Sequence, residues 1–441
     1  MPRWLVAALL VTLGATQARA QRADSGVHAP DTAAIPARPK LEPGADTNSA
    51  QANYAYGMKR IYDSPMESVR AFYWASRIDP SSADAMYALW TAKLIVLSDK
   101  DVLSYFNRSG RGTPSQIALD SLIYGAYALN PFLFSSIDAA LMRRRIEARI
   151  FLEFPKKTIG EQEEIVSGKM QAAEYRPEIA YAEGRFQAAL KWYATELDAA
   201  AHPVRLPQKR QTKVKQNARE KAFIEMMKVE FAFELVDMHA KRARIFYHLH
   251  ELDSASTEMT TAISILEAQD SGAAELPYMS KAIFEQSLGM IYEHDRRLDL
   301  AREAYGRALQ EDLSYYAAHS RIAGLELEHG DTAVALSEMK LAVELQPRDP
   351  ALRYRYAEVL LDARRDADAA EQLRRAIALD PYYGPPHLLL ATIGDFESYT
   401  SDAIAEYQTY IALAARSDPQ LPQVRARLAK LTASMASTQS H

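Results

Sequence analysis

The fold is decided by residues 282–383, in which LDLAREAYGRA (298–308), TAVALSEMKLA (332–342) and DADAAEQLRRA (366–376) follow one another at intervals of 34 residues. In each segment the fourth residue is alanine, the eighth is large, and the eleventh is alanine again. Positions three and four apart share one face of an α-helix. Small residues on that face let a second helix approach closely, and the large residue fills the space toward the next unit. The stretch therefore predicts stacked pairs of antiparallel helices.

The same spacing recurs on both sides of this stretch. TSDAIAEYQTY (400–410) continues it toward the C-terminus, and a copy at 236–269 precedes it, with extra residues at 270–281. Weaker matches contain Ser68, Phe72 and Ala75, then Leu119, Ile123 and Ala126, and a divergent copy lies at 184–196. The pattern resembles the tetratricopeptide repeat, a helix–turn–helix unit of 34 residues. The resemblance is strong over 236–417 and weaker over 50–200.

This resemblance implies an all-α solenoid of stacked antiparallel helix pairs, wound into a right-handed superhelix. The first helix of each pair would line a concave groove that receives a peptide, a helix or a protein loop. Carried over position by position, the groove-facing residues would be Lys241, Arg244, Tyr247, His248, Gln286, Met290, Glu293, His294, Ser320, Leu327, Glu328, Tyr354, Glu358 and Leu361. Tyr247 and Tyr354 are the preferred candidates, because aromatic residues contribute disproportionately to binding energy. The Lys, Asn and Arg set with which chaperone-binding members clamp a C-terminal carboxylate is not visible.

The first fifty residues lack the repeat pattern. Residues 1–20 combine a short basic start, an apolar run and Ala18-Arg19-Ala20, which is typical of a secretory signal peptide. The apolar run is shorter than the roughly 20 residues that span a bilayer. Residues 21–50 are rich in proline and small polar residues and poor in large apolar ones, so we expect a disordered tether there.

The amino-acid composition disfavours several classes of function. The 441 residues carry a formal net charge of −5 and no cysteine. An acidic chain presents no general field that attracts nucleic acid. A chain without cysteine has no disulfide framework, thiol nucleophile or thiolate metal site. With the signal sequence, this composition predicts export across the inner membrane of a bacterium and residence in the periplasm, with the extracellular space as the alternative. No membrane span is expected once the signal peptide is cleaved.

The rest of the chain divides by pattern and charge. We expect divergent helical repeats at 51–200, a basic linker at 201–222, the repeat array at 223–418, and a capping helix with a tail at 419–441. A solvated linker is the favoured interpretation of the basic segment, and a peripheral contact with anionic lipid through 209–221 is the alternative. Within the divergent part, the sequence favours an enlarged surface loop at Asp99–Pro114 and a long helix from Phe132 to Phe154.

No catalytic or cofactor motif is visible. The glycine-containing segment 107–112 lacks the P-loop spacing, and His248 and His250 with Glu251 lack the His-Glu-x-x-His spacing of zinc proteases. The Gly-x-Ser-x-Gly motif of α/β-hydrolases is also absent. We therefore predict a protein that is not an enzyme and that needs no cofactor or metal.

These observations predict a non-enzymatic protein–protein interaction scaffold of the bacterial envelope, which binds a peptide or protein segment of the envelope in the groove. Two alternatives stay open. One is a structural accessory subunit of a secretion, polysaccharide-export or outer-membrane assembly machine. The other is an enzyme in the divergent region 90–200, which would require a deep polar pocket there.

Overall fold

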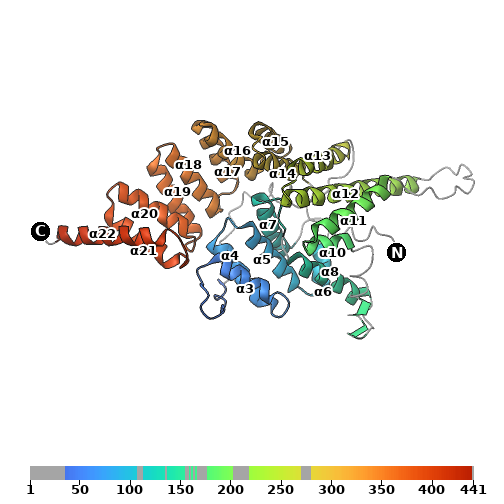
Figure 1. Ribbon diagram of the computed structural model, residues 1–441, viewed down its shortest axis with the longest axis horizontal. Coiled ribbons are helices and arrows are strands. Elements are labelled where there is room, and N and C mark those ends of the chain that lie inside the picture. The colour runs from blue at the N-terminus through green and yellow to red at the C-terminus, as the bar shows by residue number, and fades with distance from the viewer. Residues whose placement is uncertain are drawn as a thin grey trace, which may run out of the picture. The chain divides into compact units, whose positions relative to one another are not determined.

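The computed structural model describes residues 35–106, 113–134, 137–153, 176–201, 218–269 and 280–439, with a few positions between 158 and 165 (Figure 1). In these residues all regular secondary structure is α-helical and no strand occurs, as the sequence predicts. The chain divides into two compact units. Unit 1 contains the described residues of 93–308, and unit 2 contains those of 34–92 and of 309–441.

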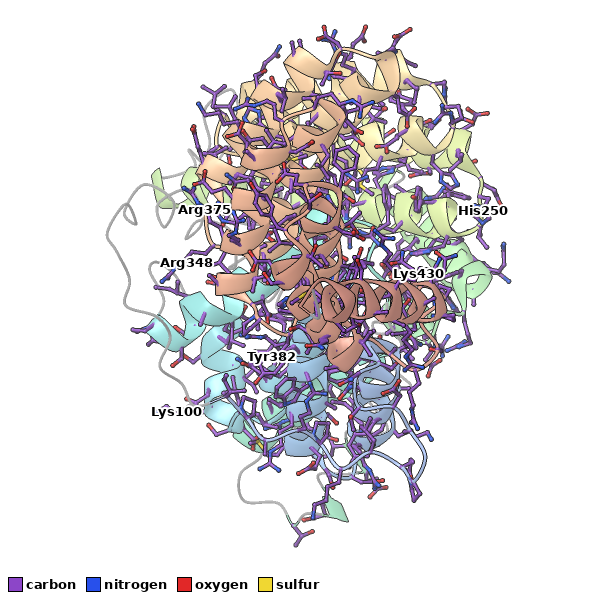
Figure 2. All side chains as sticks on the ribbon, turned by 90° about the vertical axis from the view of Figure 1, so that its left-hand side faces the viewer. Lys100, His250, Arg348, Arg375, Tyr382 and Lys430 are labelled. Carbon is purple, nitrogen blue, oxygen red and sulfur yellow. The ribbon has the colours of Figure 1, made fainter. Side chains whose placement is uncertain are left out.

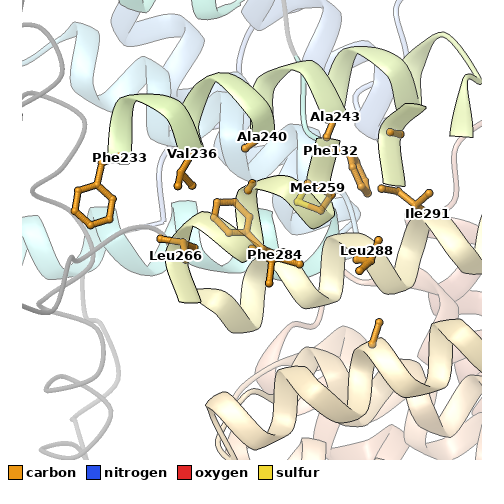
Figure 3. Close-up of a cluster of buried hydrophobic side chains, with 14 residues drawn as sticks. Phe132, Phe233, Val236, Ala240, Ala243, Met259, Leu266, Phe284, Leu288 and Ile291 are labelled. Carbon is orange, nitrogen blue, oxygen red and sulfur yellow. The ribbon is translucent and has the colours of Figure 1, made fainter. Parts of the chain in front are cut away.

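Unit 1 is a set of helices that pack mainly on their neighbours in the chain. Its helices are α6 (Asp99–Phe106), α7 (Pro114–Leu129), α8 (Ile137–Glu153), α10 (Arg176–Ala182), α11 (Phe186–Ala201), α12 (Ala218–His248), α13 (Leu252–Gln269), α14 (Lys281–His294) and most of α15 (Leu298–Glu311). One hydrophobic core joins α12, α13 and α14 (Figure 3). In that core Val236 of α12, Met259 of α13 and Leu288 of α14 are all buried.

Unit 2 combines an N-terminal helix pair with the C-terminal repeats. The N-terminal part contains α3 (Ala50–Arg60), α4 (Pro65–Ile78) and most of α5 (Ala83–Ile95). The C-terminal part contains α16 (Tyr316–His329), α17 (Thr332–Leu345), α18 (Pro350–Asp362), α19 (Asp366–Leu379), α20 (Gly384–Phe396), α21 (Thr400–Leu413) and α22 (Leu421–Gln439). Helix α22 packs Leu421, Val424 and Leu431 against the last pair, in the region where the sequence predicts a capping helix.

The predicted ladder of small and large residues is confirmed. The small positions are buried, at Ala301, Ala308, Ala335, Ala342, Ala369, Ala376 and Ala403. The large positions are buried as well, at Tyr305, Met339, Leu373 and Tyr407. The close approach is most evident at Gly289 of α14, where an added Cβ would lie 2.5 Å from Cε1 of Tyr305.

From α12 onward, the turn between the two helices of each pair contains one residue in the left-handed conformation. These residues recur with the repeat, at His250, Arg296, Gly330, Arg364 and Ser398, with φ between 58° and 84°. At Gly330 the chain closes a pair of hydrogen bonds, from Gly330 N to Leu327 O and from Asp331 N to Glu326 O. This pattern ends an α-helix by satisfying carbonyls that the helix leaves unpaired. The first helix of each pair therefore stops at a fixed position.

In unit 2 the N-terminal helix pair and the segment just before it contact the C-terminal repeats. Arg77 of α4 forms an ion pair with Asp380, with 2.8 Å between Nε and Oδ2. Asn48 donates from Nδ2 to the carbonyl of Ala412 at 2.7 Å, and Arg416 donates from Nη2 to the carbonyl of Gly44 at 2.8 Å. The first repeat and the last repeats thus form one compact unit.

Two sequence predictions in unit 1 are corrected. The segment predicted as an enlarged loop at Asp99–Pro114 contains the helix α6. The long helix predicted from Phe132 begins only at Ile137, because Phe132 and Leu133 follow Pro131 into the interior and are buried there. A short apolar run therefore serves as a core anchor at the end of α7.

At the N-terminus, the disordered tether predicted for 21–50 does not extend through 35–49, since Arg38, Asp46 and Asn48 make specific hydrogen bonds. The signal peptide at 1–20 and the first part of the tether lie outside the described residues. So does most of the basic linker, whose last residues, from Ala218, begin α12. None of the described helices combines the length and apolar character needed to cross a membrane.

Candidate functional site

The residues predicted for the groove all lie on the first helix of a pair. Helices α12 and α14 in unit 1 carry Lys241, Arg244, Tyr247, His248, Gln286, Met290, Glu293 and His294. Helices α16 and α18 in unit 2 carry Ser320, Tyr354 and Glu358. The two groups differ in what their side chains contact.

In unit 1 the first-helix face holds a segment of the chain itself. Gln286 donates from Nε2 to the carbonyl of Ala128, at the end of α7, at 2.8 Å. His248 Nε2 lies 2.8 Å from the carbonyl oxygen of Phe132, so this nitrogen must be the donor. The ring of Tyr247 stacks on that of Phe132, with 3.9 Å between centroids and 13° between planes. Residues 128–134 therefore lie where the resemblance implies a bound peptide.

Lys241 is buried in a network of charges that also belongs to unit 1. Its Nζ lies 2.7 Å from a carboxylate oxygen of Asp237 and 2.7 Å from one of Glu178 on α10. Burial acts to lower the pKa of Lys241, but the two carboxylates outweigh it and raise the pKa. The amine stays charged at physiological pH, so it is an ion-pair partner and not a nucleophile.

Arg244 faces two tyrosines on elements outside the repeat array. Its guanidinium carbon lies 5.3 Å from the centre of the ring of Tyr127 on α7. It also bonds to the hydroxyl of Tyr181 on α10, a phenol whose pKa burial raises to about 12. Both phenols are thus neutral at physiological pH, and Arg244 joins α12 to α7 and α10.

The remaining predicted residues of unit 1 lie toward the end of α14. Met290 packs against the core, and Glu293 accepts a hydrogen bond from the hydroxyl of Tyr305 at 2.6 Å. His294 is exposed, and its ring stacks on that of His250 with 5.7 Å between centroids. Among the described residues no group of three or more His, Asp or Glu side chains is placed to hold a metal ion.

In unit 2 the first-helix face presents small and polar side chains to solvent. Gly324, Glu358 and Thr392 occupy the same position of successive repeats, and all three are exposed. The hydroxyl of Tyr354 bonds to the carboxyl of Glu358. Although Glu358 is exposed, partial desolvation of its carboxyl raises its pKa, and Asp362 adds to this effect, whereas the hydrogen bond from Tyr354 and the charge of Arg355 act against it.

Ser320 lies on the same face of unit 2, one turn before Gly324. Its side chain is 9% exposed, and its hydroxyl has no hydrogen-bond partner among the described residues. Tyr354 is half-buried and meets Tyr383 edge to face, with 5.8 Å between centroids. Together these residues form a polar face with one aromatic anchor.

Sequence reasoning missed the aromatic residues that fill the face in unit 1. Phe134 meets Phe186 at 4.8 Å and Tyr181 at 5.6 Å between centroids, and Phe186 stacks on His248 at 5.7 Å. The one available signal was the apolar run Phe132-Leu133-Phe134 after Pro131, which was read as the start of a helix.

It also missed a polar pair that links the two helices of a repeat. Histidine Nδ1 and a glutamate carboxylate oxygen lie 2.6 Å apart in His239–Glu258, His319–Glu338 and His387–Glu406. The two partners are 19 residues apart in each pair, so this spacing was present in the sequence.

The chain was compared with known proteins. No family model matches it, and no curated protein sequence does. Similar solved structures include YrrB, titled a TPR protein with an unusual peptide-binding site, at 16% identity over 48% of this chain and 98% of that one, with a TM-score of 0.35. PilF of Pseudomonas aeruginosa is 18% identical over 47% of this chain and 89% of that one, with a TM-score of 0.38. The C-terminal part of a TPR repeat-containing protein from Cytophaga hutchinsonii is 16% identical over 55% and 79%, with a TM-score of 0.40.

The likeness to the tetratricopeptide repeat fold rests on properties of this chain. Its helices form antiparallel pairs in a 34-residue frame, with buried alanine where the helices meet. A left-handed residue ends the first helix of successive pairs. These are the features of the unit that the sequence resembles. The described helices thus have the paired, repeated architecture of the tetratricopeptide repeat fold.

Proposed function

We propose that the protein is a non-enzymatic interaction scaffold of the bacterial envelope, and that unit 2 binds a peptide or protein segment on the first-helix face of α16, α18 and α20. The observation that carries this proposal is the row of exposed equivalent positions at Gly324, Glu358 and Thr392. Beside this row, Tyr354 supplies an aromatic anchor of the kind that dominates interface energies. Among the residues that the structure describes, no helix or loop covers these exposed positions as residues 128–134 cover the face of unit 1.

The residues of unit 1 predicted for the groove are in a different situation. Lys241 and Gln286 are buried, and Tyr247 and His248 already contact Phe132. A partner that used them would have to displace residues 128–134, of which Phe132 and Leu133 are buried core residues. Partner contacts by this group therefore remain a prediction, and we rank them below the face of unit 2.

Site-specific photo-crosslinking tests the proposal. A photoreactive amino acid replaces Glu358, Thr392 or, as the control, Lys340, an exposed residue on the second helix of its pair. We expect crosslinks to one defined envelope protein from positions 358 and 392 and none from position 340. Tyr354→Ala should reduce that crosslink at least about tenfold, as expected for an aromatic anchor. Equal crosslinking from all three positions would sink the assignment of this face.

The envelope location needs a separate measurement. We expect the mature chain to begin at Gln21 and to be released with periplasmic proteins by osmotic shock, because residues 1–20 have the pattern of a signal peptide. Retention of residues 1–20 in the purified native protein, with recovery in the cytoplasm, would overturn the location and leave the binding face untouched.

A further inference from the structure

Two aromatic side chains from distant parts of the sequence form a ledge in unit 2. Trp74 of α4 and Tyr382, in the turn between α19 and α20, meet edge to face, with 5.0 Å between centroids and 83° between planes. Figure 2 shows Tyr382 beside the blue helices of the N-terminal repeat. We call Trp74 and Tyr382 the aromatic ledge.

The segment Pro36-Ala37-Arg38-Pro39 lies on the aromatic ledge. The indole Nε1 of Trp74 donates a hydrogen bond to the carbonyl of Pro36 at 2.9 Å. The guanidinium carbon of Arg38 lies 4.4 Å from the centre of the Trp74 ring and 5.8 Å from that of Tyr382. Pro39 is buried, whereas Ala37 and Lys40 are exposed. The contact with the aromatic ledge therefore uses the carbonyl of Pro36 and the guanidinium of Arg38, and the neighbouring Pro39 is buried.

These are the groups by which aromatic surfaces recognise proline-rich segments. Proline fixes its own φ, so an extended proline-containing segment loses little conformational entropy when it binds. Aromatic-lined surfaces dock Pro-x-x-Pro segments in this way. A guanidinium stacks on aromatic rings through its planar, weakly hydrated face, which an ammonium group lacks. The ledge is thus suited to arginine rather than lysine between the prolines.

The charges around the aromatic ledge are also compatible with an arginine-containing segment. Asp380, in the same turn as Tyr382, is buried at 4% exposure and is already paired with Arg77 at 2.8 Å. Arg77 also lies 5.8 Å from the centre of the Tyr382 ring. Since Arg77 neutralises this carboxylate, Arg38 is held by the ring faces and by hydrogen bonds within its own segment, one of them to Oδ1 of Asn48 at 3.0 Å. Within its own segment Arg38 also donates to the carbonyl of Thr47 at 2.7 Å.

We propose that the aromatic ledge is a recognition site for extended Pro-x-Arg-Pro segments, and that residues 36–39 occupy it as a displaceable ligand within the chain. The segment is anchored a second time at Asp46 and Asn48, which bond to residues 412–416, so its departure from the ledge leaves that anchor in place. A partner segment of the same chemistry would compete with a tethered one whose effective concentration is on the order of millimolar. The proposal uses other residues than the face of α16, α18 and α20 and does not depend on it.

Fluorescence anisotropy of a labelled peptide tests the proposal on the full chain. The peptide IPARPKLE copies residues 35–42. Arg38→Ala weakens the tethered ligand and should lower the apparent Kd of the peptide at least about tenfold relative to the wild type, because the competing tethered segment is removed. Lys40→Ala changes an exposed residue of the same segment and should behave as the wild type. A peptide with alanine in place of its arginine should bind none of these proteins.

A second pair of variants locates the site. Combining Arg38→Ala with Trp74→Phe keeps a ring but removes the indole N–H, and combining Arg38→Ala with Tyr382→Ala removes the other ring. Relative to Arg38→Ala alone, the first should raise the apparent Kd several-fold, at about 1 kcal/mol for one lost hydrogen bond. The second should raise it at least about tenfold, because an aromatic anchor is lost. Circular dichroism confirms that each variant is folded. The proposal is overturned if folded Arg38→Ala binds the peptide no more tightly than the wild type, or if neither second substitution weakens binding.

Discussion

At the scale of single residues, the fold depends on how closely two helices of a pair approach. Gly289 lies opposite Tyr305, and Gly57 lies opposite Phe72, so that an added Cβ would meet the ring at 2.5 Å and 2.6 Å. In both pairs the glycine is on the first helix and the large residue is on the second. The large residue of the ladder thus packs directly on the backbone of its partner helix.

Gly289→Ala is expected to lower the free energy of unfolding by about 1–3 kcal/mol, because overpacking forces the buried ring of Tyr305 to move. Gly306→Ala is the matched control. Gly306 lies within helix α15 with no atom within 4 Å of an added Cβ, so alanine should stabilise by about 0.5–1 kcal/mol through its helix propensity. Urea denaturation followed by circular dichroism measures both changes. Changes of the same sign in the two variants would contradict this account.

At the scale of elements, polar pairs join the first helix of a repeat to the second. In the pair α12 and α13, the carboxylate of Glu258 lies 2.6 Å from Nδ1 of His239 and 2.6 Å from Nη2 of Arg242. The histidine and glutamate recur at the equivalent positions of α16 and α17 and of α20 and α21. The two helices of a pair are thus joined both by the buried alanine contacts and by these polar contacts.

Glu258 makes the stability of this helix pair depend on pH. Burial acts to raise its pKa, but hydrogen bonds from His239 and Arg242 outweigh burial and lower it. A carboxyl with a lowered folded pKa contributes stability above its unfolded pKa of about 4.3, and the contribution is lost as the pH falls through the folded pKa. Glu258→Gln should therefore destabilise by about 1–3 kcal/mol at pH 7, and the difference from the wild type should shrink toward pH 3.

The control for this pH profile is Glu344→Gln. Glu344 lies on α17, is 59% exposed and makes only a 3.7 Å surface pair with Lys340. Pairs of this kind contribute little, so its urea midpoint should follow the wild type at every pH. A Glu258→Gln difference that stays constant between pH 7 and pH 3 would show that the carboxylate charge has no part in the effect.

At the scale of the molecule, unit 2 is held together by contacts between its N-terminal and C-terminal parts. The carboxylate of Asp380 is 6% exposed and its partner is Arg77, on a helix of the first repeat. Burial raises the pKa of Asp380, and Arg77 acts against that rise. This pair, with the contacts of residues 44–48 to 412–416, joins the N-terminal repeat to the C-terminal repeats in one compact unit.

Arg77→Ala should lower the stability of unit 2 by about 2–3 kcal/mol at pH 7, because it leaves a buried carboxylate without its counter-charge. The loss should be smaller at low pH, where the carboxyl is neutral. Differential scanning calorimetry measures the change, and Arg70→Ala, which removes an exposed pair with Glu67, is the control. Equal effects of the two substitutions would contradict the proposed role of Arg77.

Particular residues show which parts of the fold could be predicted from the sequence. The alanine and large positions, such as Ala335 and Met339, were predicted because residues three and four apart on a helix must share a face. Lys241, Tyr247, Ser320 and Tyr354 were placed on first helices by the resemblance to the tetratricopeptide repeat, and the structure has them there. Helix α6 was missed, because eight residues beside a glycine- and serine-containing segment give too short a pattern.

The sequence by itself determined the repeated helix pairs, because each pair is specified by small and large residues a few positions apart and by contacts between neighbouring helices. Only the tertiary structure decided what the first-helix faces and the aromatic ledge contact. Phe132 meets His248 across 116 positions of sequence, and Gly44 meets Arg416 across 372. Local periodicity contains no information about such distant pairs. The same helix face can be covered by any exposed segment of suitable chemistry, wherever that segment lies in the sequence. The repeat pattern therefore predicts the same kind of first-helix face in unit 1 and in unit 2. Only the folded chain shows that the face of unit 1 is occupied and the face of unit 2 is exposed.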